Sequence, residues 1–222
     1  MTRVAVLNYG MGNLRSVEKA LERVGAEAQI TADAELAAGA DGVILPGVGA
    51  FPKAMERIRQ LGLDAFLREW AGAERPLLGI CLGMQLLFDS SEELGGDRGL
   101  GILAGEVTAL DAGGLKVPHM GWEPVRWERS SRFADGVPSG TPFYFVHSFA
   151  ARPADPEAVV GTAVWGERFP CVVERGRTWG VQFHPEKSSG AGLALLTKFV
   201  DICAGLSRPG GGGGEAEHVA SQ

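Results

Sequence analysis

The sequence predicts an α/β fold: a three-layer sandwich with a central, mostly parallel sheet and a mixed or antiparallel C-terminal half. Up to about residue 100, short apolar runs alternate with segments whose apolar residues recur at helical spacing. This alternation is typical of a parallel sheet covered by helices on both faces. Beyond that point, strand-like runs follow one another between glycine and proline turns, which is typical of an antiparallel or mixed sheet.

The first half divides into strands and helices in turn. Apolar runs predict strands at residues 3–8, 27–30, 42–45 and 76–80. Apolar residues every three or four positions predict helices from a cap at Asn13 to Gly25, through residues 51–58 and 63–70, and at residues 82–88. Parallel strands need such crossover helices to connect them.

The second half is predicted to hold short strands and one closing helix. The strands are expected at residues 106–110, 116–120, 123–127, 143–150, 159–165, 171–174 and 178–183. Helical spacing of apolar residues predicts the helix at residues 191–206. Residues 1–206 therefore form one predicted domain. Residues 207–222, which include five consecutive glycines, are predicted to be a disordered tail.

Composition narrows the class of protein. With 27 acidic against 21 basic residues the net charge is -6, so we expect no basic surface for nucleic acid or an anionic membrane. The chain starts directly with a strand-like run, and no apolar stretch reaches the roughly 18 residues of a membrane helix. Its three cysteines are widely spaced, unlike those of a disulfide framework or a zinc site. We therefore expect a cytoplasmic protein with no metal and no cofactor.

Cys81 is the candidate nucleophile. It is the centre of Gly79-Ile80-Cys81-Leu82-Gly83, between a predicted buried strand and a predicted helix. This is the pattern of a nucleophile elbow with cysteine in place of serine, in which glycines leave room for a strained turn. The helix N-terminus favours the thiolate, and its free amides can stabilise an oxyanion. The alternative is that Cys81 is a small buried residue of the core. The two flanking glycines favour the nucleophile over this alternative.

His184 and Glu186 are the candidate base and its orienting carboxylate. They follow a predicted strand in Gln182-Phe183-His184-Pro185-Glu186. In an extended segment, residues two apart project from the same face, so Glu186 can bond one ring nitrogen and leave the other for the thiol. A structural His–Glu pair is the alternative. Of the other histidines, His119 and His147 lack a neighbouring carboxylate and His218 lies in the tail.

These motifs resemble the class I glutamine amidotransferases, in which Gly79 to Gln85 and His184-Pro185-Glu186 have close counterparts. Further segments are similar to one branch of this family, glutaminase subunits that supply a cyclase: residues 8–13, 46–51, 118–122, 144–148 and 184–188. The resemblance covers roughly residues 4–206. It departs from the pattern at Phe149, where tyrosine is common, at Glu123, where asparagine is expected, and in the tail.

The resemblance implies a reaction. Cys81 would attack the side-chain amide of glutamine, release ammonia and form a glutamyl thioester, which water activated by His184 would hydrolyse. The oxyanion hole would use the amides of Val48 and Leu82. The amino acid end of glutamine would be held by the side chains of Gln85 and Glu93 and by backbone groups of Gly49, Ser148 and Phe149. From the residues alone, Glu93 would be taken for a solvated charge at a helix end.

The resemblance also implies a partner: a separate (β/α)8-barrel cyclase subunit of histidine biosynthesis. A barrel needs about 250 residues, so it must lie on another chain. We expect the interface at Asn8, Tyr9, Asn13, Pro118, His119, Met120 and Trp122. The case for the last two is that Met and Trp suit an interface core, although Trp122 packed inside the domain is the alternative.

Other functions are compatible with parts of the sequence. A glutaminase serving another acceptor, such as an anthranilate or aminodeoxychorismate synthase, would share the Cys81 and His184 motifs but not residues 8–13 or 118–122. A non-catalytic binding subunit would not be expected to retain all three triad residues. The case for nucleotide binding through Gly10-Met11-Gly12 is weak. The dinucleotide-binding fingerprint requires a third glycine at position 15, where this chain has Arg15.

The assignment of the nucleophile leads to a prediction. Cys81→Ser is expected to abolish glutamine hydrolysis, because an alcohol at this position is a far weaker nucleophile than a thiolate. Cys171→Ser and Cys203→Ser should retain most of the activity. A glutamine-like chloroketone, followed by peptide mass spectrometry, should label Cys81 alone. Labelling mainly at Cys171 would contradict the assignment.

Overall fold

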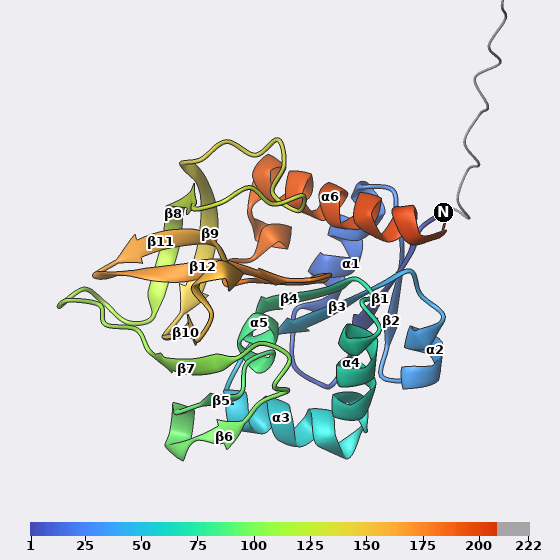
Figure 1. Cartoon of the computed structure of the whole chain (residues 1–222), viewed down its shortest axis with the longest axis horizontal. Helices are drawn as coiled ribbons and strands as arrows, with labels where there is room; N and C mark the ends of the chain where they lie inside the picture. The colour runs from blue at the N-terminus through green and yellow to red at the C-terminus, as the bar shows by residue number, and fades with distance from the viewer. Residues whose placement is uncertain (208–222) are drawn as a thin grey trace, which may run out of the picture.

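A computed structural model describes residues 1–207 of the chain (Figure 1). Its last helix ends at Ser207, one residue inside the predicted tail. Residues 208–222, the rest of that tail, lie outside the described residues, so their disorder stays a prediction.

The helices and strands alternate in the first half of the chain and are mainly strands in the second. The helices of the described residues are α1 (Leu14–Arg23), α2 (Ala34–Ala38), α3 (Phe51–Gln60), α4 (Leu63–Gly72), α5 (Leu82–Leu86) and α6 (Ser189–Ser207). The strands are β1 (Arg3–Leu7), β2 (Glu27–Thr31), β3 (Gly42–Gly47), β4 (Leu77–Cys81), β5 (Ser90–Ser91), β6 (Asp97–Arg98), β7 (Gly105–Ala109), β8 (His119–Trp127), β9 (Thr141–His147), β10 (Phe149–Pro153), β11 (Val159–Trp165), β12 (Glu167–Arg175) and β13 (Thr178–Val181).

The central sheet of the described chain has the strand order β2-β1-β3-β4-β13-β12-β11-β8-β9. From β2 to β13 every neighbouring pair is parallel, and from β13 to β9 every pair is antiparallel. A second sheet has the order β10-β7-β5-β6. The predicted α/β architecture, with a parallel centre and a mixed second half, is confirmed.

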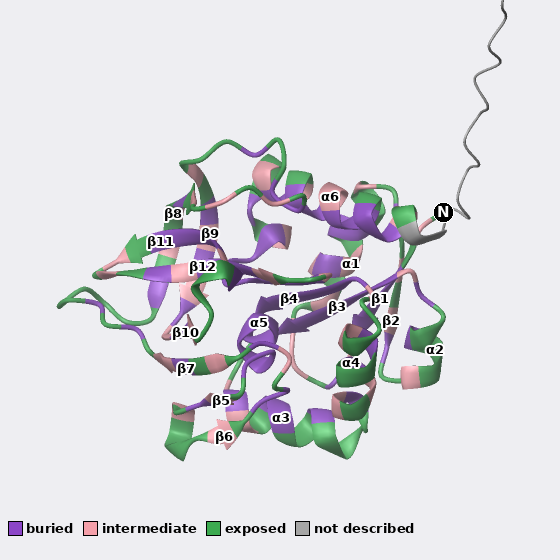
Figure 2. Cartoon of the chain, viewed as in Figure 1, coloured by how far each residue is buried: buried purple, intermediate pink, exposed green. Residues whose placement is uncertain are grey.

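Alternating side chains on the strands form two cores. Val4 and Val6 of β1 belong to the core under α1 and α6, whereas Ala5 and Leu7 belong to the core under α3, α4 and α5. Figure 1 shows α1 and α6 on one side of the sheet and α3 and α4 on the other. Strands β1, β3 and β4 between them are almost wholly buried (Figure 2). Since both faces are covered, these strands are continuously apolar.

Several elements differ from the sequence prediction. Residues 116–127 do not form two strands, because β8 runs unbroken through Gly121 and pairs with β9 from His119 to Val125. The predicted strand at 143–150 is instead divided, and Ser148 separates β9 from β10. Asn13 precedes α1 but its side chain makes no capping hydrogen bond. Helix α5 ends at Leu86, earlier than predicted.

Short elements are also missing from the prediction. Helix α2 has only five residues, and its clearest local signal is Asp33, whose carboxylate accepts hydrogen bonds from the amides of Glu35 and Leu36. Strands β5 and β6 have two residues each. Elements this short have no hydrophobic period of their own, so pairing with distant segments decides them.

Helix α5 lies unusually close to β3. A Cβ added at Gly83 would overlap the carbonyl oxygen of Leu45, and one added at Gly79 would come within 2.7 Å of the carbonyl oxygen of Gly83. Both obstacles are backbone, which cannot rotate away as a side chain can. Glycine at these positions therefore permits the tight strand-to-helix turn between β4 and α5.

This close approach predicts the effect of a methyl group. Gly83→Ala is expected to lower the free energy of unfolding by about 3 kcal/mol or more, because α5 must move off β3. Gly72→Ala, at a helix-end position with nothing within 4 Å of the new Cβ, should be neutral or slightly stabilising. Urea unfolding of both variants measures the difference. Equal stabilities would mean that α5 does not pack as described.

Candidate active site

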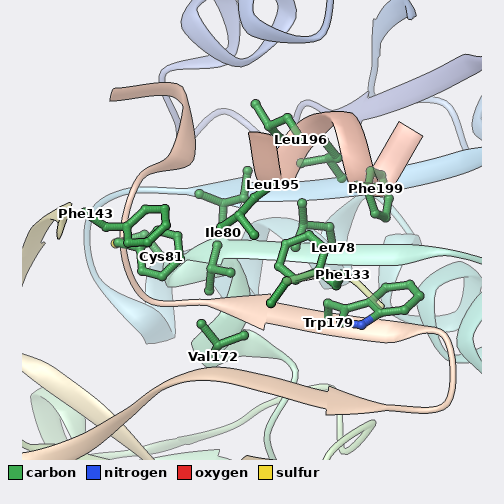
Figure 3. Close-up of a cluster of buried hydrophobic side chains, with 14 of the residues drawn as sticks. Leu78, Ile80, Cys81, Phe133, Phe143, Val172, Trp179, Leu195, Leu196 and Phe199 are labelled. Carbon is green, nitrogen blue, oxygen red and sulfur yellow. The ribbon is translucent and has the colours of Figure 1, made fainter. Parts of the chain in front are cut away.

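Cys81 stands at the turn from β4 to α5. Its backbone has φ 54° and ψ -112°, a conformation that non-glycine residues rarely adopt. The strained turn predicted from the flanking glycines is therefore present. The side chain is 6% exposed and belongs to the buried cluster that also contains Leu78 and Ile80 of the same strand (Figure 3). A cysteine in such a turn is held by the fold rather than by its own preference.

His184 and Glu186 form a buried pair just beyond β13. His184 Nδ1 lies 2.8 Å from Glu186 Oε1, and each side chain is 2% exposed. His184 itself is extended, but Pro185–Lys187 forms a short 3₁₀ helix. Glu186 therefore reaches the ring through a turn, not through the alternation of a strand as predicted. The backbone amide of His184 also donates to the carbonyl of Tyr144, which ties the backbone at His184 to β9.

The other ring nitrogen of His184 is available for chemistry. Nε2 is buried and has no hydrogen-bond partner among the described residues. Burial by itself would lower the pKa of His184, but the neighbouring Cys81 and Glu186 outweigh burial and raise the pKa to about 10. Cys81 is thus close enough to perturb the imidazole. The arrangement favours an imidazolium at His184 beside the Cys81 sulfur at neutral pH.

Gln182 is a further residue at the thiol that the sequence prediction did not single out. Its side-chain Nε2 lies 3.7 Å from Cys81 Sγ, while the thiol lies 3.8 Å from the carbonyl oxygen of Val146. Gln182 is fully buried. The available signal was a polar side chain two residues before His184 in an otherwise apolar strand, because such a residue shares a face with the histidine.

The thiol opens into a cavity of about 290 Å³. Its volume suits a small metabolite more than a drug-sized ligand. The residues that line it include all those predicted for the oxyanion hole and for substrate binding: Val48, Leu82, Gly49, Gln85, Glu93, Ser148 and Phe149. Cys81, Pro118, Val146 and His147 complete the lining. The structure therefore brings together segments from four distant parts of the chain.

Two polar side chains of the cavity have one atom left for a ligand. Gln85 Nε2 lies 3.0 Å from both the carbonyl oxygen of Phe149 and Oε1 of Gln182. With both N–H groups of Gln85 occupied, its Oε1 remains as an acceptor. Glu93 Oε2 accepts from the amide of Phe51 at 2.8 Å, and its Oε1 has no partner among the described residues. Glu93 is thus fixed by the start of α3 and is not a freely solvated charge.

Tyr9 is buried beneath the loop that carries Val48. Its side chain is fully buried, and its hydroxyl donates to the carbonyl of Pro46 at 2.6 Å. The sequence prediction that Tyr9 contributes to a partner interface is therefore wrong for its side chain. Two effects raise the pKa of Tyr9: burial, which is the larger, and the electrostatic interaction with Cys81. The phenol therefore stays protonated and remains a donor.

The other residues predicted for the partner interface fall into two groups. Met120 and Trp122 on β8 are 58% and 49% exposed, so the alternative that Trp122 packs inside the domain is excluded. Pro118 and Asn13 are exposed and Asn8 is half-buried. His119 is fully buried, because alternate residues of β8 point inward. Its side chain cannot contact a partner, which corrects that prediction.

His119 and His147 form a second buried histidine pair. His119 Nδ1 lies 2.9 Å from His147 Nε2, and His147 Nδ1 lies 2.9 Å from the carbonyl oxygen of Phe149. Burial lowers the pKa of both rings to about 4. At neutral pH these two rings are therefore neutral, whereas His184 is charged. This difference agrees with the assignment of His184 as the base.

No group of His, Cys, Asp and Glu within residues 1–207 has the arrangement of a metal site. In the same part of the chain, no helix is long and apolar enough to cross a membrane. The three cysteines are all unpaired and buried.

The fold and the site, a cysteine in a strained turn beside a buried His–Glu pair, are those expected of a glutamine amidotransferase. Residues 5–203 match the family model described as glutamine amidotransferase class-I. The chain belongs to the class I glutamine amidotransferase family.

Curated relatives are similar over nearly their whole length. The chain is 52% identical over 202 residues to imidazole glycerol phosphate synthase subunit HisH of Moorella thermoacetica, covering 91% of this chain and 96% of the relative. It is 50% identical over 199 residues to the HisH subunit of Bacillus cereus strain G9842, covering 90% and 94%.

Solved structures share the fold. A glutamine amidotransferase crystal structure has a TM-score of 0.72 at 23% identity, covering 90% of this chain and 98% of that one. The structure of PurLQS from Thermotoga maritima has a TM-score of 0.70 at 20% identity, covering 93% of this chain and 99% of the matched one. The predicted class I amidotransferase architecture is confirmed.

The geometry of the His184–Glu186 pair predicts a pH effect. Glu186→Gln removes a charge that raises the pKa of His184, so the imidazolium should be lost at lower pH than in the wild type. The rate of Cys81 alkylation and kcat, followed against pH, should both show this shift. His184→Ala should cost roughly 10²- to 10⁴-fold in kcat and Glu186→Gln less. An unchanged pH profile in Glu186→Gln would make Glu186 a purely structural residue.

Proposed function

We propose that this chain hydrolyses L-glutamine to L-glutamate and ammonia through the triad Cys81, His184 and Glu186. The observation that carries the proposal is Cys81, whose strained backbone places the thiol at a small cavity with a few polar groups, next to a buried imidazole whose remaining nitrogen is free. Family membership identifies the substrate class. No cofactor is needed, because the thiolate and imidazolium supply both the nucleophile and the acid.

The reaction proceeds in two halves. The Cys81 thiolate attacks the amide carbon of glutamine, and the resulting oxyanion accepts hydrogen bonds from the amides of Leu82 and Val48. His184 transfers its proton to the leaving nitrogen, which departs as ammonia and leaves a glutamyl thioester. The now neutral His184 takes a proton from water, whose oxygen attacks the thioester carbon. Collapse expels the Cys81 thiolate while His184 keeps its proton, and the product acid loses its own proton to solvent and leaves as glutamate, so the thiolate–imidazolium pair is restored.

The ends of glutamine need different partners. The free Oε1 of Glu93 suits the α-ammonium group, and the free Oε1 of Gln85 suits a second N–H donor of the substrate. The backbone groups of Gly49, Ser148 and Phe149 lie around the same cavity and suit the α-carboxylate and the remaining polar atoms. A single unneutralised carboxylate in the cavity favours a zwitterion over a dicarboxylate such as glutamate.

The ammonia is proposed to pass to a HisF-type cyclase with a (β/α)8-barrel, which forms a heterodimer with this chain and makes imidazole glycerol phosphate and AICAR in histidine biosynthesis. The similarity to HisH subunits supports this role, and three free cysteines suit the reducing cytoplasm. Pro118 lines the cavity, while Met120 and Trp122 are exposed on the strand that follows. A partner docked on these side chains would lie next to the site where ammonia forms.

The partner proposal is tested by Trp122→Ala. Loss of a large exposed anchor should weaken cyclase binding at least tenfold, since aromatic anchors dominate such interfaces. Leu36→Ala, an exposed apolar residue of α2, is the control and should bind as the wild type does. Binding is measured by titration calorimetry, and folding by circular dichroism.

Activity supplies the second measurement. Ammonia release from glutamine should be slow for the isolated chain and faster with the cyclase and its ligand. Full activity without the partner would refute the coupling, and unchanged binding by Trp122→Ala would move the interface elsewhere. Failure to trap a glutamyl thioester in a single turnover would refute catalysis and leave a binding subunit of the same fold.

A further inference from the structure

The buried pair of His119 and His147 connects the interior side of β8 to the wall of the cavity. The two residues are paired neighbours on β8 and β9. His119 stacks on Trp165 at 4.4 Å and on Phe145 at 5.1 Å between ring centroids, and Phe169 packs edge-on against it. A ring held this way has little freedom to rotate, so its hydrogen-bonding direction is fixed.

The contacts determine which nitrogens carry protons. A carbonyl oxygen can only accept, so His147 Nδ1, at 2.9 Å from the carbonyl oxygen of Phe149, must be the protonated nitrogen. His147 Nε2 is then the bare acceptor, and the 2.9 Å contact with His119 requires a proton on His119 Nδ1. His119 Nε2 remains as a bare nitrogen, in agreement with its lack of a partner in residues 1–207. Both rings are thus neutral Nδ1–H tautomers.

The carbonyl at the end of this series also orients Gln85. The oxygen of Phe149 accepts from Gln85 Nε2 at 3.0 Å as well as from His147. Two donors from different directions fix this oxygen, and the oxygen in turn fixes which way the Gln85 amide faces. If the side-chain amide of Gln85 were flipped, its oxygen would face two other acceptors, the Phe149 carbonyl and Oε1 of Gln182, and no hydrogen bond could form.

We infer that His119 and His147 are positioning residues for glutamine: two imidazoles in series hold the Phe149 carbonyl, and with it the Gln85 amide, so that Gln85 presents its oxygen to the substrate. The inference deepens the function proposed above and rests on glutamine binding in this cavity. Neither histidine takes part in proton transfer. His147 acts through Phe149 and Gln85, and His119 acts through His147 by donating to its Nε2 and holding the ring in place.

The tautomers can be observed directly in the full chain. Two-bond ¹H–¹⁵N correlation spectra of ¹⁵N-histidine-labelled protein at neutral pH distinguish protonation at Nδ1 from protonation at Nε2. With four histidines in the chain, single substitutions assign the signals. We expect His119 and His147 both as neutral Nδ1–H forms. Observation of the Nε2–H form at His147 overturns the inference.

Substitutions then test the effect on the substrate. Glutamine affinity is measured by calorimetry with Cys81→Ser as the parent, so that no turnover occurs. His147→Phe removes the donor to the carbonyl and should weaken binding about tenfold. His147→Asn, whose Nδ2 takes the place of Nδ1, should restore most of the affinity. His119→Phe keeps the stacking but removes the donor to His147 Nε2, so the His147 ring is held less firmly. Binding should weaken, though less than in His147→Phe, and the His147 signal should remain Nδ1–H because the Phe149 carbonyl still accepts from Nδ1.

Phe169→Leu is the packing control. It alters the ring that touches both histidines but removes no hydrogen bond, so it should lower stability without changing glutamine affinity or the tautomers. Equal affinity in the parent and in both Phe substitutions overturns the positioning role while leaving the proposed function intact. A parent that binds no glutamine overturns the proposed function and this inference together. Weakening by Phe169→Leu as large as that by His119→Phe shows packing alone and also overturns the inference.

Discussion

The contact between helix α5 and strand β3 constrains the whole active site. Because Gly83 brings the backbone of α5 against the carbonyl of Leu45, the chain has no room for a gradual turn after β4. It reverses within one residue, Cys81, at φ 54°. Such a conformation costs about 1–3 kcal/mol, which the buried parallel strands on both sides offset. The thiol therefore faces the cavity because of how the sheet packs.

A second constraint is that the site is both buried and polar. Unpaired polar atoms are costly away from water, so nearly all of them are paired internally. Gln85 donates to Gln182 and to the carbonyl of Phe149, and His147 donates to the same carbonyl. Among the atoms left over are some that lie where chemistry needs them: Nε2 of His184 near the thiol, and Oε1 of Gln85 and Glu93 at the cavity. Internal pairing thus defines the sites that remain for substrate.

The two buried histidine pairs show how environment divides one residue type into two roles. His184 has a carboxylate and a thiol beside it, which together raise its pKa to about 10. His119 and His147 have aromatic rings, a carbonyl and each other, and burial lowers their pKa to about 4. One histidine can therefore carry a proton to the leaving group, while the other two remain neutral and rigid. Nearby charge, not burial alone, separates them.

The sequence by itself determined the α/β class, the strained Cys81 turn and the pairing of His184 with Glu186, because each depends on residues close in the chain. Family resemblance extended this to the cavity lining. Tertiary structure alone decided that Tyr9 and His119 point inward, that Gln182 reaches the thiol and that β8 is one strand. These features arise from pairing and packing between segments far apart in sequence. A local sequence pattern cannot predict such contacts, because which face of a strand is buried depends on the segments that pack against it. On β8, for example, Met120 is in solvent and His119 is in the core.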